Sequence, residues 1–264
     1  MFAGTLLFGL GCLSLSIQDS LGAELPRLWI IGDSTVRNGS GKGDNGQWGW
    51  GDKLAPHFDA SQITLVNRAI GGRSSRTFLT DGRWEAILSE AKSGDYLLIQ
   101  FGHNDPAPIN DETRARGTIP GIGEESQEID NLLTKKRETV HTFGWYLRKY
   151  VREAKAKGIQ PVLCTYVPRC PRPGQAWPVK AEMASYRLWT KQVAEEEKAH
   201  WIDLFGLVEE EYLLLAQEEI KKRYFCDADF THTNEAGAEL NVACLVKAIR
   251  ALPMHPLRGF LLKG

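Results

Sequence analysis

The segment RLWIIGDSTVRNG, from Arg27 to Gly39, places an apolar run directly before a Gly-Asp-Ser-Thr turn. A continuous apolar run of this length is typical of a strand buried on both faces, as in a parallel sheet. Ser34 then follows the carboxyl end of that first strand, where open α/β folds bind their ligands. A serine at this place can be a helix cap, part of a phosphate-binding turn or a nucleophile. The remaining sequence decides among these roles.

Further segments alternate between strand and helix patterns along the chain. Continuous apolar strands separated by amphipathic helices predict a parallel sheet that is covered on both faces. The expected fold class is therefore α/β, a three-layer α/β/α sandwich with a central parallel sheet of about five strands. The expected strands are 27–32, 63–67, 95–102, 160–167 and 200–204, and the expected helices are 84–92, 141–158, 180–199 and 234–252.

The chain of 264 residues has a length that suits one large domain. It contains no internal repeat and no low-complexity linker, so we expect a single domain over residues 24–264. One irregular stretch, residues 105–131, holds three prolines and three glycines and follows an expected strand end. A structureless loop of this length inside a compact domain is usually either functional or disordered, and we expect this one to elaborate the active face of the sheet.

The N-terminal residues differ in composition from the rest of the chain. Residues 2–17 are mostly apolar, and small and polar residues then lead to Ala23, which is the pattern of a secretory signal peptide over residues 1–23. The apolar run is short and rich in Gly and Ser for a membrane span, which needs about 20 apolar residues. Cys12 gives only a faint lipoprotein pattern, because Gly9 stands where an aliphatic residue is usual. We therefore expect a secreted or periplasmic protein without a lipid anchor.

Charge and cysteine content narrow the possible functional classes. The 32 Lys and Arg residues and 33 Asp and Glu residues give a formal net charge of −1, which does not favour a nucleic-acid partner. Without the signal peptide four cysteines remain, an even number that allows one or two disulfides, and buried free thiols fit equally well. None of them has the C-x-x-C spacing of a zinc site. They are Cys164, Cys170, Cys226 and Cys244.

Polar and glycine residues also stand at the carboxyl ends of other expected strands. Gly72, in a Gly-Gly turn, follows the second strand, and Asn104, in Gly-His-Asn-Asp, follows the third. Glycine lets backbone N–H groups approach a ligand, or it satisfies a turn with positive φ. Asp229 and His232 lie three residues apart before the last expected helix, so that one loop presents both. A hydrogen-bonded Asp–His pair fixes the imidazole tautomer that a serine nucleophile requires.

Each of these signals also has a purely structural explanation. Asp and Ser cap helices, Asn-Asp before a proline forms a turn, and a histidine beside capping residues is common at surfaces. The His-Asn order differs from that of metallophosphoesterases, and the Asp-x-His that a two-metal site needs near the first strand is absent, so no metal is expected. Walker A, His-Glu-x-x-His and G-x-S-x-G sequences are absent as well.

The order of these four polar stretches along the chain identifies a family more specifically than any single stretch does. Ser34, Gly72, Asn104 and the pair Asp229 and His232 resemble the four blocks of the SGNH (GDSL-like) hydrolase superfamily. A closer resemblance is to the rhamnogalacturonan acetylesterase family, carbohydrate esterase family 12. The phrases that carry it are GDSTV, GWGDKLAPHF, NRAIGGRSSRTF, FGHNDP and DFTHTNEAGA. The resemblance covers nearly the whole chain after the signal peptide and implies the flavodoxin-like SGNH hydrolase fold.

The resemblance also implies a mechanism for these residues. Ser34 attacks the acyl carbonyl, His232 acts as general base, and Asp229 orients His232. The backbone N–H groups of Ser34 and Gly72 and the side-chain amide of Asn104 form the oxyanion hole. The resemblance implies no metal or organic cofactor. The implied partner is an acetylated polysaccharide or oligosaccharide, most specifically rhamnogalacturonan.

The candidate substrate-binding residues are less specific than the catalytic ones. Arg73 and Arg76 lie just after the second block, and Arg114 and Arg116 lie in the long loop. A basic side chain in this region suits the carboxylates of a pectic backbone. Trp48 lies in a glycine-rich stretch, where an indole can face a sugar ring. Each of these five side chains fits a structural or solvated role equally well.

Other functions remain open from the sequence. The same triad also suits acetylated xylan, another acetylated glycan or a lipid ester, although no apolar lid segment indicates a lipase. A non-catalytic carbohydrate-binding protein on this scaffold is expected to lack the serine or the histidine, and both are present. A two-metal phosphoesterase would be sensitive to EDTA. We expect a monomer with no nucleic-acid partner and no membrane span after the signal peptide.

Overall fold

A five-stranded parallel sheet lies at the centre of the computed structural model, which describes residues 1, 24–174, 181–227 and 229–263. The predicted signal peptide therefore lies, apart from Met1, outside the described residues. All neighbouring strands of the sheet are parallel, which confirms the expected α/β class. The strands, in their order across the sheet, are β2 (Thr64–Asn67), β1 (Arg27–Gly32), β3 (Tyr96–Gln100), β6 (Gln160–Cys164) and β7 (His200–Ile202).

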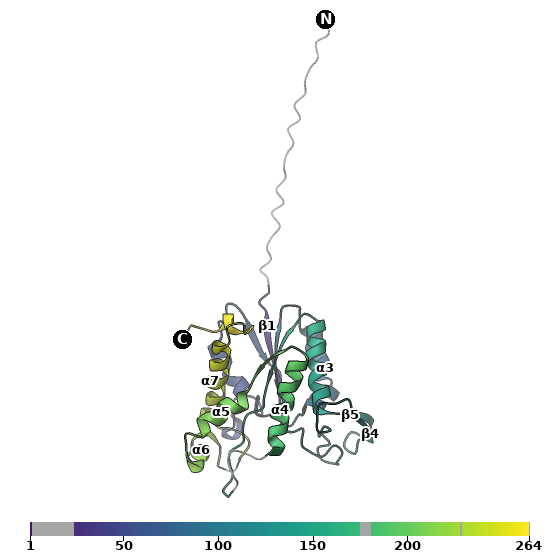
Figure 1. Cartoon of the computed structure of the whole chain (residues 1–264), viewed down its shortest axis with the longest axis vertical. Helices are drawn as coiled ribbons and strands as arrows, with labels where there is room; N and C mark the ends of the chain where they lie inside the picture. The colour runs from purple at the N-terminus through teal and green to yellow at the C-terminus, as the bar shows by residue number, and fades with distance from the viewer. Residues whose placement is uncertain (2–23, 175–180, 228, 264) are drawn as a thin grey trace.

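Alternate side chains of β1 face two separate hydrophobic cores. Leu28 and Ile30 pack into the core under α5, α6 and α7, whereas Trp29 and Ile31 pack under α1 to α4. Figure 1 shows α7 and α3 on opposite sides of the sheet, which makes the three layers that the sequence predicts. The helices are α1 (Ser75–Thr80), α2 (Arg83–Glu90), α3 (Phe143–Ala156), α4 (Ala181–Glu196), α5 (Leu204–Tyr212), α6 (Gln217–Tyr224) and α7 (Glu235–Ala251).

The four helices predicted from periodicity correspond to α2, α3, α4 and α7, with ends that differ by a few residues. The sequence patterns did not predict α1, α5 and α6. Helix α1 is only six residues long and follows the Gly-Gly turn, so its apolar periodicity is too short to detect. Its start is nevertheless encoded locally, because Ser74 and Thr77 form a reciprocal capping box. The four short 3₁₀ turns are Asp44–Gly46, Trp50–Lys53, Ala55–His57 and Arg258–Phe260.

The stretch 105–131 is not irregular throughout, contrary to the sequence analysis. Its last residues form β4 (Ser126–Asp130), which pairs antiparallel with β5 (Arg137–His141). This hairpin lies apart from the central sheet, below α3 in Figure 1. Most side chains of β4 and β5 are exposed and polar, so they lack the apolar alternation that identifies a half-buried strand.

The buried side chain of Arg76, on α1, forms hydrogen bonds with the long loop and with the hairpin that follows it. Its side chain is fully buried, and its guanidinium donates to both carboxylate oxygens of Glu138 at 2.7 Å. The same group donates to the carbonyl oxygens of Ile109 at 2.7 Å and Gly117 at 2.8 Å. The expectation that Arg76 contacts substrate does not fit this placement, because all three guanidinium nitrogens already donate within the protein and no side-chain surface is accessible.

All four cysteines that follow the predicted signal peptide are free thiols in the structure. Cys164, Cys170 and Cys244 are buried among core side chains, and Cys226 is partly exposed. Of the two possibilities that the sequence left open, disulfides or free thiols, the structure has the second.

We predict that Arg76→Met lowers the free energy of unfolding by about 3–5 kcal/mol, because it leaves the Glu138 carboxylate without its partner. Urea denaturation followed by circular dichroism measures this loss. Arg68→Met is the matched control, since it breaks an exposed ion pair with Glu90 at 2.7 Å. That pair is worth about 0–1 kcal/mol. Equal losses in the two variants would contradict the structural role of Arg76.

Candidate active site

Ser34 lies in a tight turn directly after β1. Asp33 Oδ1 accepts hydrogen bonds from the backbone N–H and the hydroxyl of Thr35, both at 2.8 Å, which closes an Asx-type turn around Ser34. Gly32 is required before this turn, because a Cβ there would lie 2.5 Å from Val36 Cγ2 and 2.6 Å from the Gln100 carbonyl oxygen. The turn therefore presents the Ser34 hydroxyl at the carboxyl edge of the sheet.

A chain of buried hydrogen bonds fixes this turn to the neighbouring strand. Gln100 Nε2 donates to Thr35 Oγ1 at 2.8 Å, and Trp50 Nε1 donates to Gln100 Oε1 at 2.7 Å. All three side chains and that of Asp33 are buried. Burial raises the pKa of Asp33, while its hydrogen bonds with Thr35 oppose that rise. No sequence pattern identified Thr35 or Gln100 as parts of the site, and the buried Trp50 supports the turn instead of facing a sugar ring, a role that its glycine-rich surroundings had allowed.

The structure brings the three predicted triad residues into one hydrogen-bonded line. His232 Nε2 lies 2.8 Å from Ser34 Oγ, and His232 Nδ1 lies 2.6 Å from Asp229 Oδ2. Asp229 Oδ1 also accepts the backbone N–H groups of Thr231 at 2.6 Å and His232 at 3.0 Å. With Nδ1–H donated to the aspartate, Nε2 is the acceptor for the serine proton.

Burial and hydrogen bonding have opposite effects on the pKa of Asp229. Burial alone raises the pKa of this carboxyl, but hydrogen bonds from the His232 ring and from the loop backbone outweigh burial, so the pKa is lowered. Gln47 Nε2 donates a further hydrogen bond to Asp229 Oδ2 at 2.9 Å. Gln47 was missed from sequence, since it stands 182 residues away in a glycine-rich loop with no local pattern.

The three predicted oxyanion donors come from three separate strand ends. Gly71 lies beside the nucleophile, because a Cβ there would be 3.6 Å from Ser34 Cβ. Gly72 has φ +75°, in the left-handed region that favours glycine. Among the described residues, the backbone N–H groups of Ser34 and Gly72 have no hydrogen-bond acceptor. Asn104 Nδ2 donates one hydrogen to the Arg73 carbonyl oxygen at 2.9 Å, which leaves its second hydrogen available.

Asp105 ties the loop of Gly72 to the end of β3. Its carboxylate accepts the backbone N–H of Ser75 at 3.0 Å, the Ser75 hydroxyl at 2.5 Å and the backbone N–H of Gly102 at 3.0 Å. Burial raises the pKa of this carboxyl to about 7. The neighbouring His103 is also buried, and burial together with the nearby Arg169 lowers its pKa well below the ordinary value. Burial and Arg169 thus both favour the neutral form of His103.

Two of the predicted substrate-binding residues lie near this edge with partners of their own. The Trp48 ring has the Lys53 ammonium 3.6 Å from its centroid, and Gly43 packs against the same indole. The Trp48 backbone forms two hydrogen bonds with Thr233, at 2.9 and 3.1 Å, so Trp48 supports the loop that carries His232. Arg73 forms an ion pair with Asp81 at 2.5 Å and keeps about a third of its side chain exposed.

The described residues contain no group of three or more His, Cys, Asp or Glu side chains that could hold a metal ion. Within the same residues, none of the helices has the length and apolar character needed to cross a membrane.

Comparison with known proteins identifies the family of this chain. A model described as the GDSL-like lipase/acylhydrolase family matches residues 30–240. The chain belongs to this family. It is a carboxylic ester hydrolase, and the SGNH (GDSL-like) resemblance inferred from the sequence is confirmed.

Several relatives of this GDSL-like hydrolase carry more specific names. A probable rhamnogalacturonan acetylesterase of Bacillus subtilis, YesY, is 30% identical over 89% of this chain and 97% of its own length. A rhamnogalacturonan acetylesterase of Emericella nidulans is 27% identical over 89% of each chain. The solved structure of YxiM from Bacillus subtilis has a TM-score of 0.65 and 28% identity, covering 86% of this chain and 57% of that one.

A half-buried carboxyl lies under the loop that follows Ser34 in this hydrolase. Asn67 Nδ2 donates to Asp52 Oδ1 at 2.9 Å and to the Val36 carbonyl oxygen at 3.3 Å, while Asp52 Oδ2 is buried without a hydrogen-bond partner among the described residues. Burial raises the pKa of Asp52 to about 6, although the nearby Arg37 opposes the rise.

We predict that Asp52→Asn makes the pH dependence of stability between about pH 4 and 6 less steep. In that window the native carboxyl keeps its proton while the unfolded chain has lost it, so the free energy of unfolding falls as pH rises. The asparagine keeps the acceptor for Asn67 and has no titration. Urea unfolding at pH 4, 5 and 6 gives the slope.

The matched control is Asp59→Asn. Hydrogen bonds from Ser61 and Gln62 lower the pKa of that exposed carboxyl, so it titrates below the window and its removal leaves the slope unchanged. If Asp52→Asn keeps the wild-type slope of the free energy of unfolding against pH, the Asp52 carboxyl is already ionised at pH 4 in the native protein.

Proposed function

We propose that this hydrolase is a secreted serine esterase that removes acetyl groups from an acidic plant-type polysaccharide, most specifically rhamnogalacturonan, through an acetyl-serine intermediate. The observation that carries the mechanism is the line from Ser34 Oγ to His232 Nε2 at 2.8 Å and from His232 Nδ1 to Asp229 Oδ2 at 2.6 Å. The two relatives named as rhamnogalacturonan acetylesterases support the substrate. The signal-peptide pattern of residues 1–23 supports secretion.

In the acylation step, Ser34 Oγ attacks the acetyl carbonyl carbon while His232 Nε2 takes the hydroxyl proton. Asp229 stabilises the imidazolium that forms. The carbonyl oxygen becomes an oxyanion and accepts hydrogen bonds from the N–H groups of Ser34 and Gly72 and from Asn104 Nδ2. The bond between the acetyl carbon and the sugar oxygen then breaks, and His232 returns its proton to the departing sugar hydroxyl.

In the deacylation step, water takes the place of the sugar hydroxyl. His232 removes a proton from the water, which attacks the acetyl-serine carbonyl carbon, and the same donors hold the second oxyanion. The ester bond to Ser34 breaks, Ser34 Oγ regains a proton from His232, and acetate leaves. The donors are positioned before the substrate arrives, so no reorganisation is needed when charge develops.

We predict that Ser34→Ala lowers kcat for acetate release from acetylated rhamnogalacturonan by about 10⁶-fold, because a missing nucleophile removes the whole triad as a unit. Acetate release from acetylated rhamnogalacturonan and from acetylated xylan is measured for wild type and variant. Acetate release from xylan alone would support the serine mechanism but would make xylan, and not rhamnogalacturonan, the substrate. Equal activity in both proteins would overturn the serine mechanism, and sensitivity to EDTA would then test the two-metal alternative.

We predict that Asn104→Ala lowers kcat by about 10²–10³-fold with a smaller change in KM, since the amide acts on charge that exists only in the transition state. Steady-state kinetics of acetate release give both constants. Asn110→Ala is the matched control, because that amide only joins the long loop to the hairpin, donating to the Asp130 carbonyl oxygen and accepting the Leu132 backbone N–H. A loss of less than about tenfold in Asn104→Ala would remove Asn104 from the oxyanion hole.

A further inference from the structure

The Asp229 carboxylate accepts hydrogen bonds from two separate parts of the chain. Its Oδ1 atom accepts the backbone N–H groups of Thr231 and His232, which belong to its own loop. Its Oδ2 atom accepts the His232 ring at 2.6 Å and Gln47 Nε2 at 2.9 Å. These four bonds use the four lone-pair sites of a carboxylate. Of the four donors only Gln47 comes from outside the loop, so it fixes the oxygen that binds the imidazole relative to the rest of the fold.

Asn38 holds the Gln47 amide in one orientation. Asn38 Nδ2 donates to Gln47 Oε1 at 3.1 Å, which leaves Gln47 Nε2 facing the carboxylate. An ionised carboxylate only accepts hydrogen bonds, so the opposite orientation of the amide would set oxygen against oxygen. Asn38 follows Ser34 by four residues. The hydrogen bonds from Asn38 through Gln47 to Asp229 therefore join the segment of the nucleophile to the loop of the general base.

The backbone on both sides of Gln47 is bonded to the segment that carries the triad loop. The Cys226 thiol donates to the Gly46 carbonyl oxygen at 3.2 Å, and the Trp48 N–H donates to the Thr233 carbonyl oxygen at 2.9 Å. The Gln47 side chain itself is half-buried. A side chain on such a fixed backbone has little conformational entropy left to lose when it bonds the carboxylate.

We propose that Gln47 is a positioning residue of the triad, which holds Asp229 Oδ2 in line with His232 Nδ1, and that Asn38 sets the orientation of the Gln47 amide. Gln47 acts through Asp229. A carboxylate that keeps its place stabilises the imidazolium without reorganisation when the serine proton is transferred. This inference rests on the proposed function, because it requires the serine mechanism, but it holds for any acyl acceptor.

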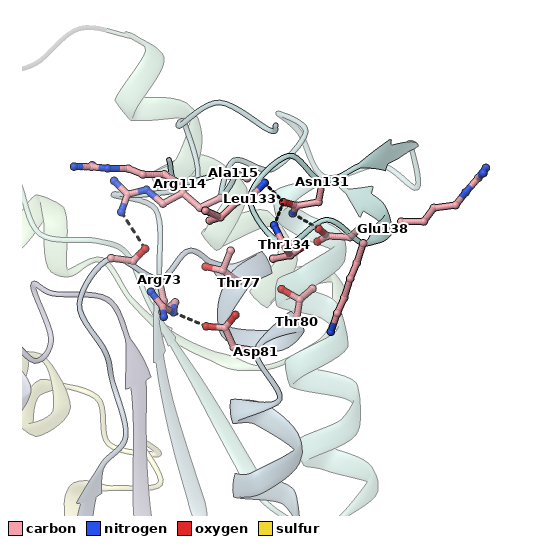
Figure 2. Close-up of a pocket in the computed structure, with 14 residues that line it drawn as sticks. Arg73, Thr77, Thr80, Asp81, Arg114, Ala115, Asn131, Leu133, Thr134 and Glu138 are labelled. Atoms are coloured by element: carbon pink, nitrogen blue, oxygen red, sulfur yellow. Dashed lines mark hydrogen bonds and ion pairs between the residues drawn. The ribbon is translucent and has the colours of Figure 1, made fainter. Parts of the chain in front are cut away.

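Gln47 does not line the hollow of about 580 Å³ that opens beside the catalytic loop. Gly72 is one of the residues that line this hollow, and Figure 2 shows Arg73 and Arg114, two of the candidate substrate-binding residues, at it. A substitution of Gln47 is therefore expected to change kcat, through Asp229, and to leave KM unchanged.

Other titratable and charged groups act on Asp229 or His232, and the test leaves all of them in place. Lys221, on α6, donates to the Asp229 backbone carbonyl oxygen at 2.7 Å. Groups that interact with one member of the pair through space are Asp33, His103, Arg169 and Cys226. Since Gln47 is uncharged, its replacement by Met changes no charge, and a change in the titration of the pair reports the lost hydrogen bond.

Gln47→Met is expected to lower kcat about tenfold at unchanged KM, the effect of one hydrogen bond to a charged group. The acid limb of kcat/KM is expected to move to higher pH, because without the amide donor the Asp229 charge favours the imidazolium more strongly. Steady-state hydrolysis of 4-nitrophenyl acetate between about pH 5 and 8 measures all three quantities.

The matched control is Gln62→Met. Gln62 Nε2 also donates to an aspartate, Asp59 Oδ2 at 2.6 Å, but on the exposed surface. This variant is expected to keep the wild-type kcat and the wild-type acid limb.

Asn38→Asp tests the orientation of the amide by itself. The new carboxylate accepts from Gln47 Nε2 and turns the amide oxygen toward Asp229, so kcat is expected to fall about tenfold. In the Gln47→Met background the same change is expected to alter kcat less than about twofold, because the amide through which it acts is absent. Equal effects in both backgrounds would overturn the role of Asn38.

The remaining outcomes separate the role of Gln47 from the function it rests on. An unchanged kcat in Gln47→Met would overturn the positioning role, and so would a lower kcat with an unmoved acid limb, which a loss of loop packing alone would give. Hydrolysis of 4-nitrophenyl acetate that persists in Ser34→Ala would overturn the serine mechanism itself. Hydrolysis of this ester without acetate release from acetylated rhamnogalacturonan would overturn the proposed substrate alone, since the role of Gln47 is measured on the model ester.

Discussion

The buried hydrogen bonds from Trp50 through Gln100 to Thr35 hold the turn that carries Ser34, and the rest of the site depends on that turn. Gln100 ends β3, and Asn104 follows four residues later, so the same strand sets the distance between the nucleophile and the third oxyanion donor. Hydrogen bonds in such a low-dielectric interior are strong when every partner is present and costly when one is missing. The nucleophile is thus positioned by a network that rigidifies the edge of the sheet.

The elements that could be predicted are those with a long, regular pattern of apolar residues in the sequence. Apolar strands and long amphipathic helices gave the layers, and the convergence of parallel strand ends brings Ser34, Gly72 and Asn104 to one edge. Asp229 and His232 meet Ser34 because their loop precedes α7 and crosses the same edge. The hairpin of β4 and β5 escaped prediction because its strands bury few side chains, so no alternation marks them.

The roles of several individual side chains could not be predicted, because they depend on burial and on contacts that form only in the folded chain. Arg76 and Arg116 are the same residue type in similarly polar stretches of sequence, yet the first is fully buried under the long loop and the second is only partly buried. Trp48 is likewise engaged by Lys53 and Thr233, contacts made from 5 and 185 residues away. Gln47 reaches Asp229 only because the folded loops meet, so no spacing rule identifies it.

The same two arginines bond the long loop to α1 and to the catalytic loop. Arg76 binds the loop from inside through the carbonyl oxygens of Ile109 and Gly117. Arg116, one residue before Gly117, then bonds the Gly72 carbonyl oxygen. The loop that encloses Arg76 is therefore also bonded to Gly72, whose N–H is the proposed oxyanion donor, so the packing of residues 105–131 and the geometry of the catalytic loop depend on each other.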